Sequence, residues 1–200
     1  MKTASKLLAF AFALALGGAA QAQVIIFSDD FNSNASGLNT TPVGWSVSGG
    51  TVDIIGEGTG YNYFPPGHGL YIDLDGSTGS AGLMSQGFSL MAGTTYVASF
   101  ELAGNQRQAG DDTVSVNFGG ASGNWTLGQS DGWTPLSLSF TPVSSGSYYL
   151  SFKNNGGDNV GALLDNVVIT AVPEPESWAL MLAGLGLLVA SGRRRLSRSA

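Results

Sequence analysis

The sequence has no cysteine and little charge. Asp, Glu, Lys and Arg make up 11% of its 200 residues, against about 25% in an average globular domain. Without cysteine a disulfide framework is excluded, so a folded domain relies on core packing, with or without a metal. Residues 23–171 contain twelve acidic and two basic residues, Arg107 and Lys153, a net charge of −10. This charge argues against nucleic acid or anionic membranes as partners.

Side chains typical of catalytic sites are scarce as well. The only histidine, His68, lies between two glycines, and no serine lies in a Gly-x-Ser-x-Gly nucleophile elbow. Asp111 and Asp112 could imitate a glycosidase pair, but adjacent residues of a strand point to opposite faces. We therefore predict a protein that is not an enzyme, with a weak glycoside hydrolase as the less favoured alternative.

Long apolar runs are missing from the middle of the chain and short at its ends. Lys2 and Lys6 precede an apolar run over 7–16, which is followed by the small residues of Ala20-Gln21-Ala22. This order is typical of a secretory signal peptide. It predicts a signal peptide over residues 1–22, cleavage before Gln23 and export of the mature protein.

The C-terminal uncharged stretch, residues 177–192, is slightly too short for a bilayer. As a helix it would reach roughly 24 Å, against about 30 Å of hydrocarbon. Glu174 and Glu176 precede it and a cluster of arginines follows it. Positive-inside orientation leaves the arginines in the cytoplasm and the upstream chain exported. We predict a single C-terminal transmembrane helix.

These features together resemble the PEP-CTERM sorting signal of Gram-negative bacteria. The resemblance rests on Pro173, Glu174 and Pro175, the short apolar stretch, and the arginines Arg193, Arg194 and Arg195. It implies that an exosortase, a membrane transpeptidase, recognises Pro-Glu-Pro and removes the tail. The protein would then be anchored transiently in the inner membrane before it reaches the cell surface or extracellular matrix. A permanent anchor is the alternative.

Between the two ends, residues 23–171 form one predicted domain, and residues 172–200 form the sorting signal. In TVSVNF (113–118) and LSLSF (136–140) every second residue is apolar, which predicts strands with one solvent-facing side. Five further segments continue the pattern: 51–55, 70–74, 94–102, 147–153 and 163–170. Glycine, at 30 of 200 residues, supplies many turns. We predict an all-β, antiparallel β-sandwich of jelly-roll type.

The domain also resembles the choice-of-anchor C family of bacterial surface proteins. The resemblance rests on FSDDFNSN (27–34), on LYIDLDGSTGSAGLMSQGFSLMAGTTYVASFELAGN (70–105) and on ALLDNVVIT (162–170). It implies a relation to a domain of unknown function in plant cell-wall proteins and the galactose-binding-like jelly roll of many carbohydrate-binding modules. Such domains often begin with an Asn-Gly-x-Phe-Glu segment, whereas this chain has Asp-Asp-Phe-Asn at 29–32.

The same resemblance implies a structural calcium ion where the first and last strands meet. The matching residues are Asp30, with Asp29 beside it, and Asp165. Calcium takes six to eight oxygen ligands and accepts carboxylates mixed with carbonyls. In an unbroken strand Asp165 would point to the same side as Val167 and Ile169. The residues of the other side, Leu164 and Val168, are apolar too, so the sequence does not decide which side of the strand faces the core. In the alternative, Asp165 caps a turn and the two opening acids are solvated.

A second acidic segment, IDLDGSTGS, lies near EF-hand spacing. With Asp73 at loop position one, Thr78 stands at position six and Met84 at position twelve. An EF-hand needs Gly and Glu there. We interpret the segment as a strand that runs into a Gly-Ser turn.

Carbohydrate binding would use exposed aromatic rings, because the C–H faces of sugars pack on them. Several aromatic residues lie in or beside Gly-, Pro- and Asn-rich stretches: Trp45, Tyr61, Tyr63, Phe64, Trp125 and Trp133. Of these, Tyr61, Tyr63 and Trp125 are the preferred ligand-binding candidates. We predict an exported, exosortase-sorted surface or matrix protein that binds carbohydrate, with exopolysaccharide as the expected ligand. A structural or adhesive biofilm matrix protein without a saccharide pocket is the alternative.

Overall fold

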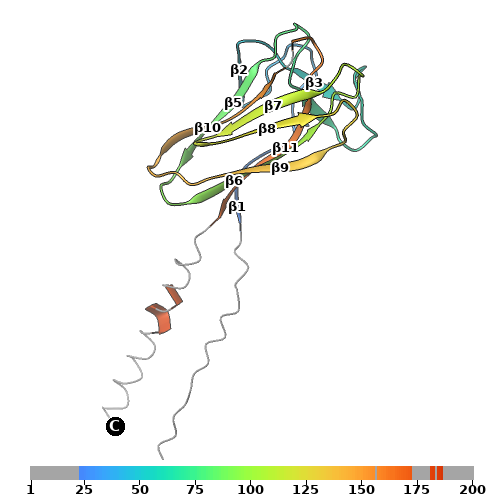
Figure 1. Cartoon of the computed structure of the whole chain (residues 1–200). Coiled ribbons are helices and arrows are strands. Elements are labelled where there is room, and N and C mark those ends of the chain that lie inside the picture. The colour runs from blue at the N-terminus through green and yellow to red at the C-terminus, as the bar shows by residue number, and fades with distance from the viewer. Residues whose placement is uncertain (1–22, 156, 173–180, 183, 187–200) are drawn as a thin grey trace, which may run out of the picture.

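A computed structural model describes residues 23–155, 157–172, 181–182 and 184–186 of the chain. Eleven strands form two stacked antiparallel sheets, as predicted (Figure 1). The strands are β1 (Val24–Asp29), β2 (Ser46–Ser48), β3 (Asp53–Gly56), β4 (Leu70–Asp73), β5 (Leu83–Leu90), β6 (Thr95–Ala103), β7 (Asp112–Phe118), β8 (Ala121–Leu127), β9 (Thr134–Phe140), β10 (Gly146–Asn154) and β11 (Leu163–Val172).

The six-stranded sheet is organised around β11. Its order is β3-β4-β11-β6-β9, and β1 also pairs with β11. The first two residues of β11 pair with β4, whereas Val167 to Ala171 pair with β1. A register shift between Asp165 and Val168 separates the two parts, with Asn166 at φ 51°. This bulge lets one strand change neighbours along its length.

The second sheet has the order β2-β5-β10-β7-β8. Alternate residues of both sheets point inward, so that Phe100 of β6 packs edge-to-face on Phe152 of β10 with ring centroids 5.1 Å apart. A smaller cluster covers the outer face of the six-stranded sheet and contains Ile55, Tyr71 and Leu163. All strands and both clusters of the described residues lie between residues 24 and 172, so this segment holds the core that the structure describes and is expected to fold by itself.

The two ends of the domain lie side by side. Val24 of β1 pairs with Ala171 of β11, so the first and last strands of the domain meet at the same end of the sandwich (Figure 1). Within the described ranges, no helix is both long and apolar enough to span a bilayer. The predicted signal peptide, the sorting residues Pro173, Glu174 and Pro175, and the arginine cluster 193–195 lie outside the described residues.

The core interaction between the sheets gives a stability prediction. Replacement of Phe100 by alanine should lower the free energy of unfolding by about 3–5 kcal/mol, because a buried ring is lost and a cavity remains. Val143→Ala is the control, since Val143 is 97% exposed and should change stability by at most about 0.5 kcal/mol. Urea unfolding of residues 23–172 measures both. A loss below about 1 kcal/mol for Phe100→Ala would contradict this packing.

Candidate functional site

The outer face of the five-stranded sheet is covered by uncharged polar side chains. Inward residues of β7 and β10 are buried, whereas their outward neighbours are almost all Ser, Thr or Asn. The outward residues of β7, β8 and β10 are Thr113, Ser115, Asn117, Ser122, Asn124, Thr126, Ser147, Tyr149, Ser151 and Lys153. Some pair across the strands, as in the 2.8 Å bond between the Thr113 and Thr126 hydroxyls.

One aromatic ring stands on this polar face. Tyr149 of β10 is 61% exposed. Its cross-strand neighbour on β5 is Gly87, and on the other side the N–H of Gly119 donates to its carbonyl at 3.0 Å. A Cβ atom on Gly87 would lie only 3.2 Å from Cε1 of Tyr149. The tyrosine ring therefore packs over Gly87, which has no side chain to cover it. Gly87 on β5 thus leaves this side of the ring accessible.

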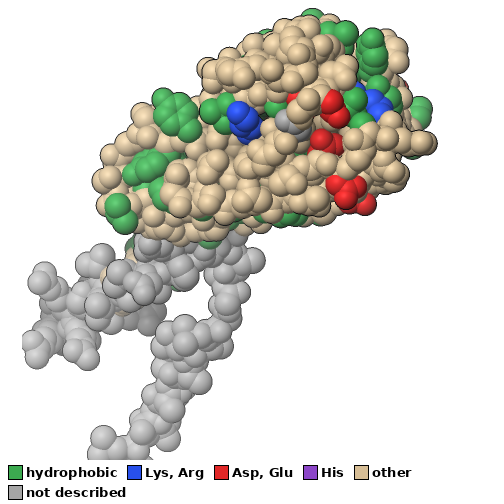
Figure 2. All heavy atoms as spheres, turned by 45° about the horizontal axis from the view of Figure 1, so that its top comes forward, with side chains coloured by type: hydrophobic (Ala, Val, Ile, Leu, Met, Phe, Trp, Pro, Cys, Tyr) green, Lys and Arg blue, Asp and Glu red, His purple; other side chains and the backbone are tan. Residues whose placement is uncertain are grey.

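The sequence prediction missed Tyr149. Its signal is the tandem Tyr148-Tyr149 within a strand, because successive side chains of a strand point to opposite faces. Tyr148 packs against the core, and Tyr149 therefore faces solvent. In Figure 2 most of the visible surface belongs to backbone and to side chains that are neither apolar nor charged, apolar side chains form separate small groups, and acidic side chains gather toward one end.

Trp125, one of the predicted ligand-binding residues, lines an open hollow of about 590 Å³. Its ring is half-buried and packs edge-to-face on Phe100, with centroids 5.5 Å apart. The rim is polar, since the side-chain amide of Asn166 donates to Glu101 at 2.7 Å beside Ser137. Trp125 therefore contributes to the core and also offers one side to the hollow.

The other two predicted ligand-binding residues lie elsewhere. Tyr61, 46% exposed, lines a hollow of about 160 Å³ beside β3. Tyr63 is half-buried, its N–H donates to the Tyr71 hydroxyl at 2.8 Å, and Arg107 lies 5.1 Å from its ring centroid. Because β3 and β9 are the two ends of the six-stranded order, the hollow of Tyr61 and that of Trp125 are separated by roughly 19 Å of sheet. The structure does not bring the three residues together.

Asp165 occupies the bulge of β11, opposite Glu101 of β6. Strand parity left the face of Asp165 open, and the bulge at Asn166 shows the reason, because it interrupts the two-residue period between Asp165 and Val167. Asp165 is buried, and burial raises its pKa to about 7. The backbone N–H of Asn166 donates to it at 2.7 Å and lowers the pKa, whereas the charge of Glu101 raises it further.

The opening acids lie near this carboxyl group, since the charges of Asp30 and Asp29 also raise the pKa of Asp165. Asp29 is occupied structurally: it accepts from the Phe31 N–H and from the indole N–H of Trp45, both at 2.8 Å. Asp30 is exposed and accepts one bond, from the Asn32 N–H at 3.2 Å. No group of three or more His, Cys, Asp or Glu side chains in the described part of the chain is arranged to hold a metal ion.

Comparisons with known proteins support this architecture and the sorting signal. Residues 28–170 match the family described as "Protein of unknown function (DUF642)", and residues 171–195 match the PEP-CTERM protein-sorting motif. No curated protein matches the chain. The sorting motif implies export and a surface or extracellular location.

Solved carbohydrate-binding modules share the fold at low identity. The CBM22-1 xylan-binding domain of Paenibacillus barcinonensis Xyn10C is 18% identical, with 78% of this chain and 99% of that chain covered and a TM-score of 0.54. The CBM22-1–GH10 modules of Clostridium thermocellum Xyn10B, complexed with xylohexaose, are 15% identical, with 76% and 29% covered and a TM-score of 0.51. The chain therefore has the jelly-roll sandwich of these modules and belongs to the DUF642 family.

Proposed function

We propose that the domain is a non-catalytic module that binds polysaccharide on the outer face of its five-stranded sheet, with Tyr149 as the platform. The observation that carries the proposal is a single exposed ring beside Gly87 on a face of hydroxyl and amide groups. A pyranose can pack its C–H face on the ring. Ser147, Ser151 and Asn117 are the neighbours that would bond the sugar hydroxyls.

The charge of the domain favours a neutral polysaccharide. Residues 23–171 carry a net charge of −10, and Lys153 is the one charged side chain among the outward residues of β7, β8 and β10. An anionic chain would be repelled at low ionic strength. Among the modules that share the fold, one is described as xylan-binding and another is complexed with xylohexaose. A neutral exopolysaccharide is the ligand class that we propose for this chain.

One alternative site and one alternative function compete with this proposal. The hollow beside Trp125 is the alternative site, because one side of the half-buried indole ring faces it and Glu101 and Asn166 form a polar rim. A structural or adhesive matrix protein without a saccharide pocket is the alternative function, and it predicts no saturable binding at either place.

Replacement of Tyr149 by alanine should weaken polysaccharide binding at least about tenfold, because a lost ring contact of ~1.4 kcal/mol corresponds to that factor. Tyr61→Ala is the matched control, an exposed tyrosine in another hollow. Binding of residues 23–172 to xylan, cellulose, β-glucan and galactan, by depletion assay and calorimetry, measures the effect. Trp125→Phe tests the hollow beside Trp125. An equal loss of affinity in Tyr149→Ala and Tyr61→Ala, or a loss of affinity in Trp125→Phe alone, would show that Tyr149 is not the binding platform.

We propose further that an exosortase processes the chain at its sorting motif, which places the mature domain outside the cell. Deletion of 173–175 in the native host should leave the protein uncut and bound to the inner membrane. Mass spectrometry of the intact protein and membrane fractionation test this. A processed mass equal to that of the wild type would show that Pro-Glu-Pro is not needed.

We also propose a structural calcium ion at Asp30 and Asp165. Both residues offer carboxylate oxygens, the ligands that calcium prefers. Burial and the neighbouring charges of Glu101, Asp30 and Asp29 raise the pKa of Asp165, and a bound cation would offset them. A carboxyl whose pKa is raised in the folded state stabilises the fold below its unfolded pKa. That contribution is lost as the pH rises through about 7.

Asp165→Asn should therefore gain stability relative to the wild type between pH 5 and pH 8 when calcium is absent. It should also show a smaller increase of Tm on addition of calcium chloride at pH 8, because one ligand is lost. Thermal unfolding of residues 23–172 with calcium chloride or with chelator measures both effects. A calcium response unchanged by the substitution would exclude Asp165 as a ligand.

A further inference from the structure

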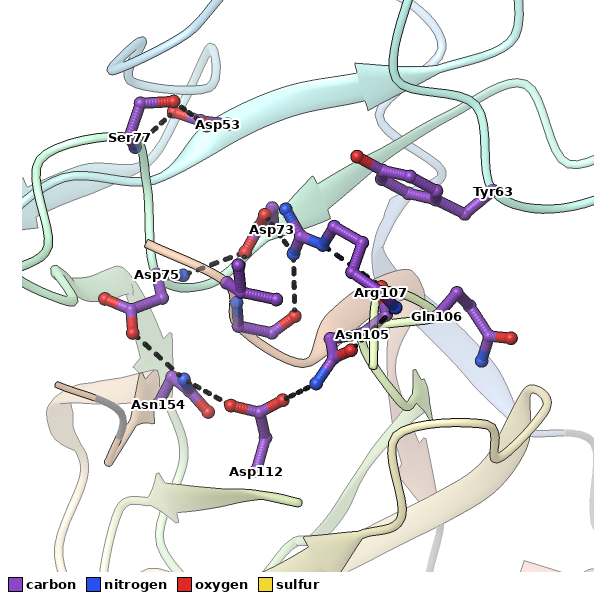
Figure 3. Close-up of polar contacts among 12 residues, drawn as sticks. Asp53, Tyr63, Asp73, Asp75, Ser77, Asn105, Gln106, Arg107, Asp112 and Asn154 are labelled. Atoms are coloured by element: carbon purple, nitrogen blue, oxygen red, sulfur yellow. Dashed lines mark hydrogen bonds and ion pairs between the residues drawn. The ribbon is translucent and has the colours of Figure 1, made fainter. Parts of the chain in front are cut away.

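A layer of buried polar side chains lies at the end of the sandwich where β4, β6 and β10 end and β7 and β11 begin (Figure 3). Asp73 at the end of β4 is fully paired there. Its carboxylate accepts from Arg107 at 2.6 Å, from the Asp75 N–H at 3.1 Å and from the Gly161 N–H at 3.0 Å. The guanidinium of Arg107 also donates to the Gly161 carbonyl at 3.3 Å. This ion pair is neutral and satisfied.

The neighbouring acids, Asp75 and Asp112, have no such cation. Asn154 at the end of β10 is shared between them, with its Nδ2 atom 3.5 Å from Oδ2 of Asp75 and 3.1 Å from Oδ1 of Asp112. Asn105 donates to the other Asp112 oxygen at 2.8 Å. In Figure 3 the side chains of Asp75, Asn154 and Asp112 point toward one another. They come from different strands and loops of both sheets.

Two buried oxygens in this cluster have no partner among the described residues. They are Oδ1 of Asp75 and Oδ1 of Asn154, and both residues are 0% exposed. An unpaired buried polar atom costs free energy, typically ~1–3 kcal/mol, and native proteins rarely leave one without a partner. Two such atoms in one cluster of carboxyl and amide groups are places for a bound partner, either an ordered water or a cation.

The charges of the cluster favour a cation. Arg107 is paired with Asp73, and Lys153, the other basic residue of the domain, is exposed on the outer face of its sheet. Asp75 and Asp112 therefore carry two negative charges without a basic partner of their own. Burial raises the pKa of Asp75 to about 6 and also raises that of Asp112. Buried ionised carboxylates need a cation or metal to offset their desolvation.

We infer that Asp75, Asp112 and Asn154 form a site for a divalent cation of the calcium type. In the cation-bound state the Asn154 amide would be turned by half a rotation, so that Oδ1 takes the place of the Nδ2 atom that now donates to both carboxylates. The atom separations of 3.1 and 3.5 Å are then close to those of adjacent ligands about 2.4 Å from a calcium ion, which lie ~3.4 Å apart when the ligands are at right angles.

The donor chemistry selects the type of ion. The cluster offers carboxylate and amide oxygens and no His or Cys, which favours calcium or magnesium over zinc. Calcium accepts irregular geometry more readily than magnesium. The charge of Asp158, in the loop after β10, raises the pKa of Asp75 and of Asp112 further. This site shares no residue with Asp30 and Asp165.

The test uses residues 23–172 in the Asp165→Asn background, so that a calcium ion at the other site does not contribute. Calcium chloride at pH 7.5 should raise the Tm and titrate calorimetrically to one ion per chain, with magnesium chloride weaker. At pH 5 the effect should shrink, because protons compete for the carboxylates. Asp75→Asn, which preserves the shape of the side chain, should weaken calcium binding more than tenfold. An unchanged affinity in that variant, or no binding in the parent protein, would overturn the inference.

Asn154→Asp separates a cation site from a simple hydrogen-bond bridge. If Asn154 only bridges the two carboxylates by hydrogen bonds, its Nδ2 donor is essential. The carboxylate that Asn154→Asp introduces would then destabilise the fold by the same amount with calcium or with chelator. In a cation site the new carboxylate is a ligand, so calcium should restore most of the lost Tm. Asn117→Asp is the control, since Asn117 is exposed on the outer face of β7 and takes no part in the cluster. Rescue of both variants, or of neither, would contradict the assignment.

Discussion

The fold depends on the pairing of β11 with three other strands. β6 pairs along one edge of β11, while β4 and then β1 occupy the opposite edge. The bulge at Asn166 makes this change of neighbour possible and places Asp165 beside Glu101. Because β1 and β11 also carry the two ends of the domain, one strand connects the core to the sorting motif that follows it.

This arrangement separates the parts of the molecule by role. The termini leave one end of the sandwich, while the buried polar layer with Asp75 and Asn154 closes the other. Between them, the five-stranded sheet presents a polar face in which Tyr149 is the exposed ring. A domain held at its β1–β11 end keeps this face and the distal end accessible to an extracellular polymer. The −10 charge of residues 23–171 keeps such a domain soluble and selects against anionic partners.

Alternation of apolar and polar residues was sufficient to predict the sandwich and the strands that are apolar on one side, such as β7 and β9. It could not find β5 and β8, because Gly and Ser residues, such as Gly87 and Ser122, weaken their β-propensity. The face of Asp165 could not be assigned from the sequence, since a bulge at Asn166 interrupts the two-residue period. Asp75 and Asn154 are 79 residues apart, and only the packing of two sheets brings them into contact.

The central claim is that saccharide binds on the outer face of the five-stranded sheet. The direct test is a ¹H–¹⁵N NMR titration of residues 23–172 with a neutral oligosaccharide, chosen as a fragment of whichever polysaccharide binds most tightly. The amide shifts locate the saccharide-binding residues. The largest amide shifts are expected at Gly87, Gly119 and Tyr149, with little change in β6 and β9. Shifts confined to 99–101 and 135–137, or no shifts with any saccharide, would contradict the claim.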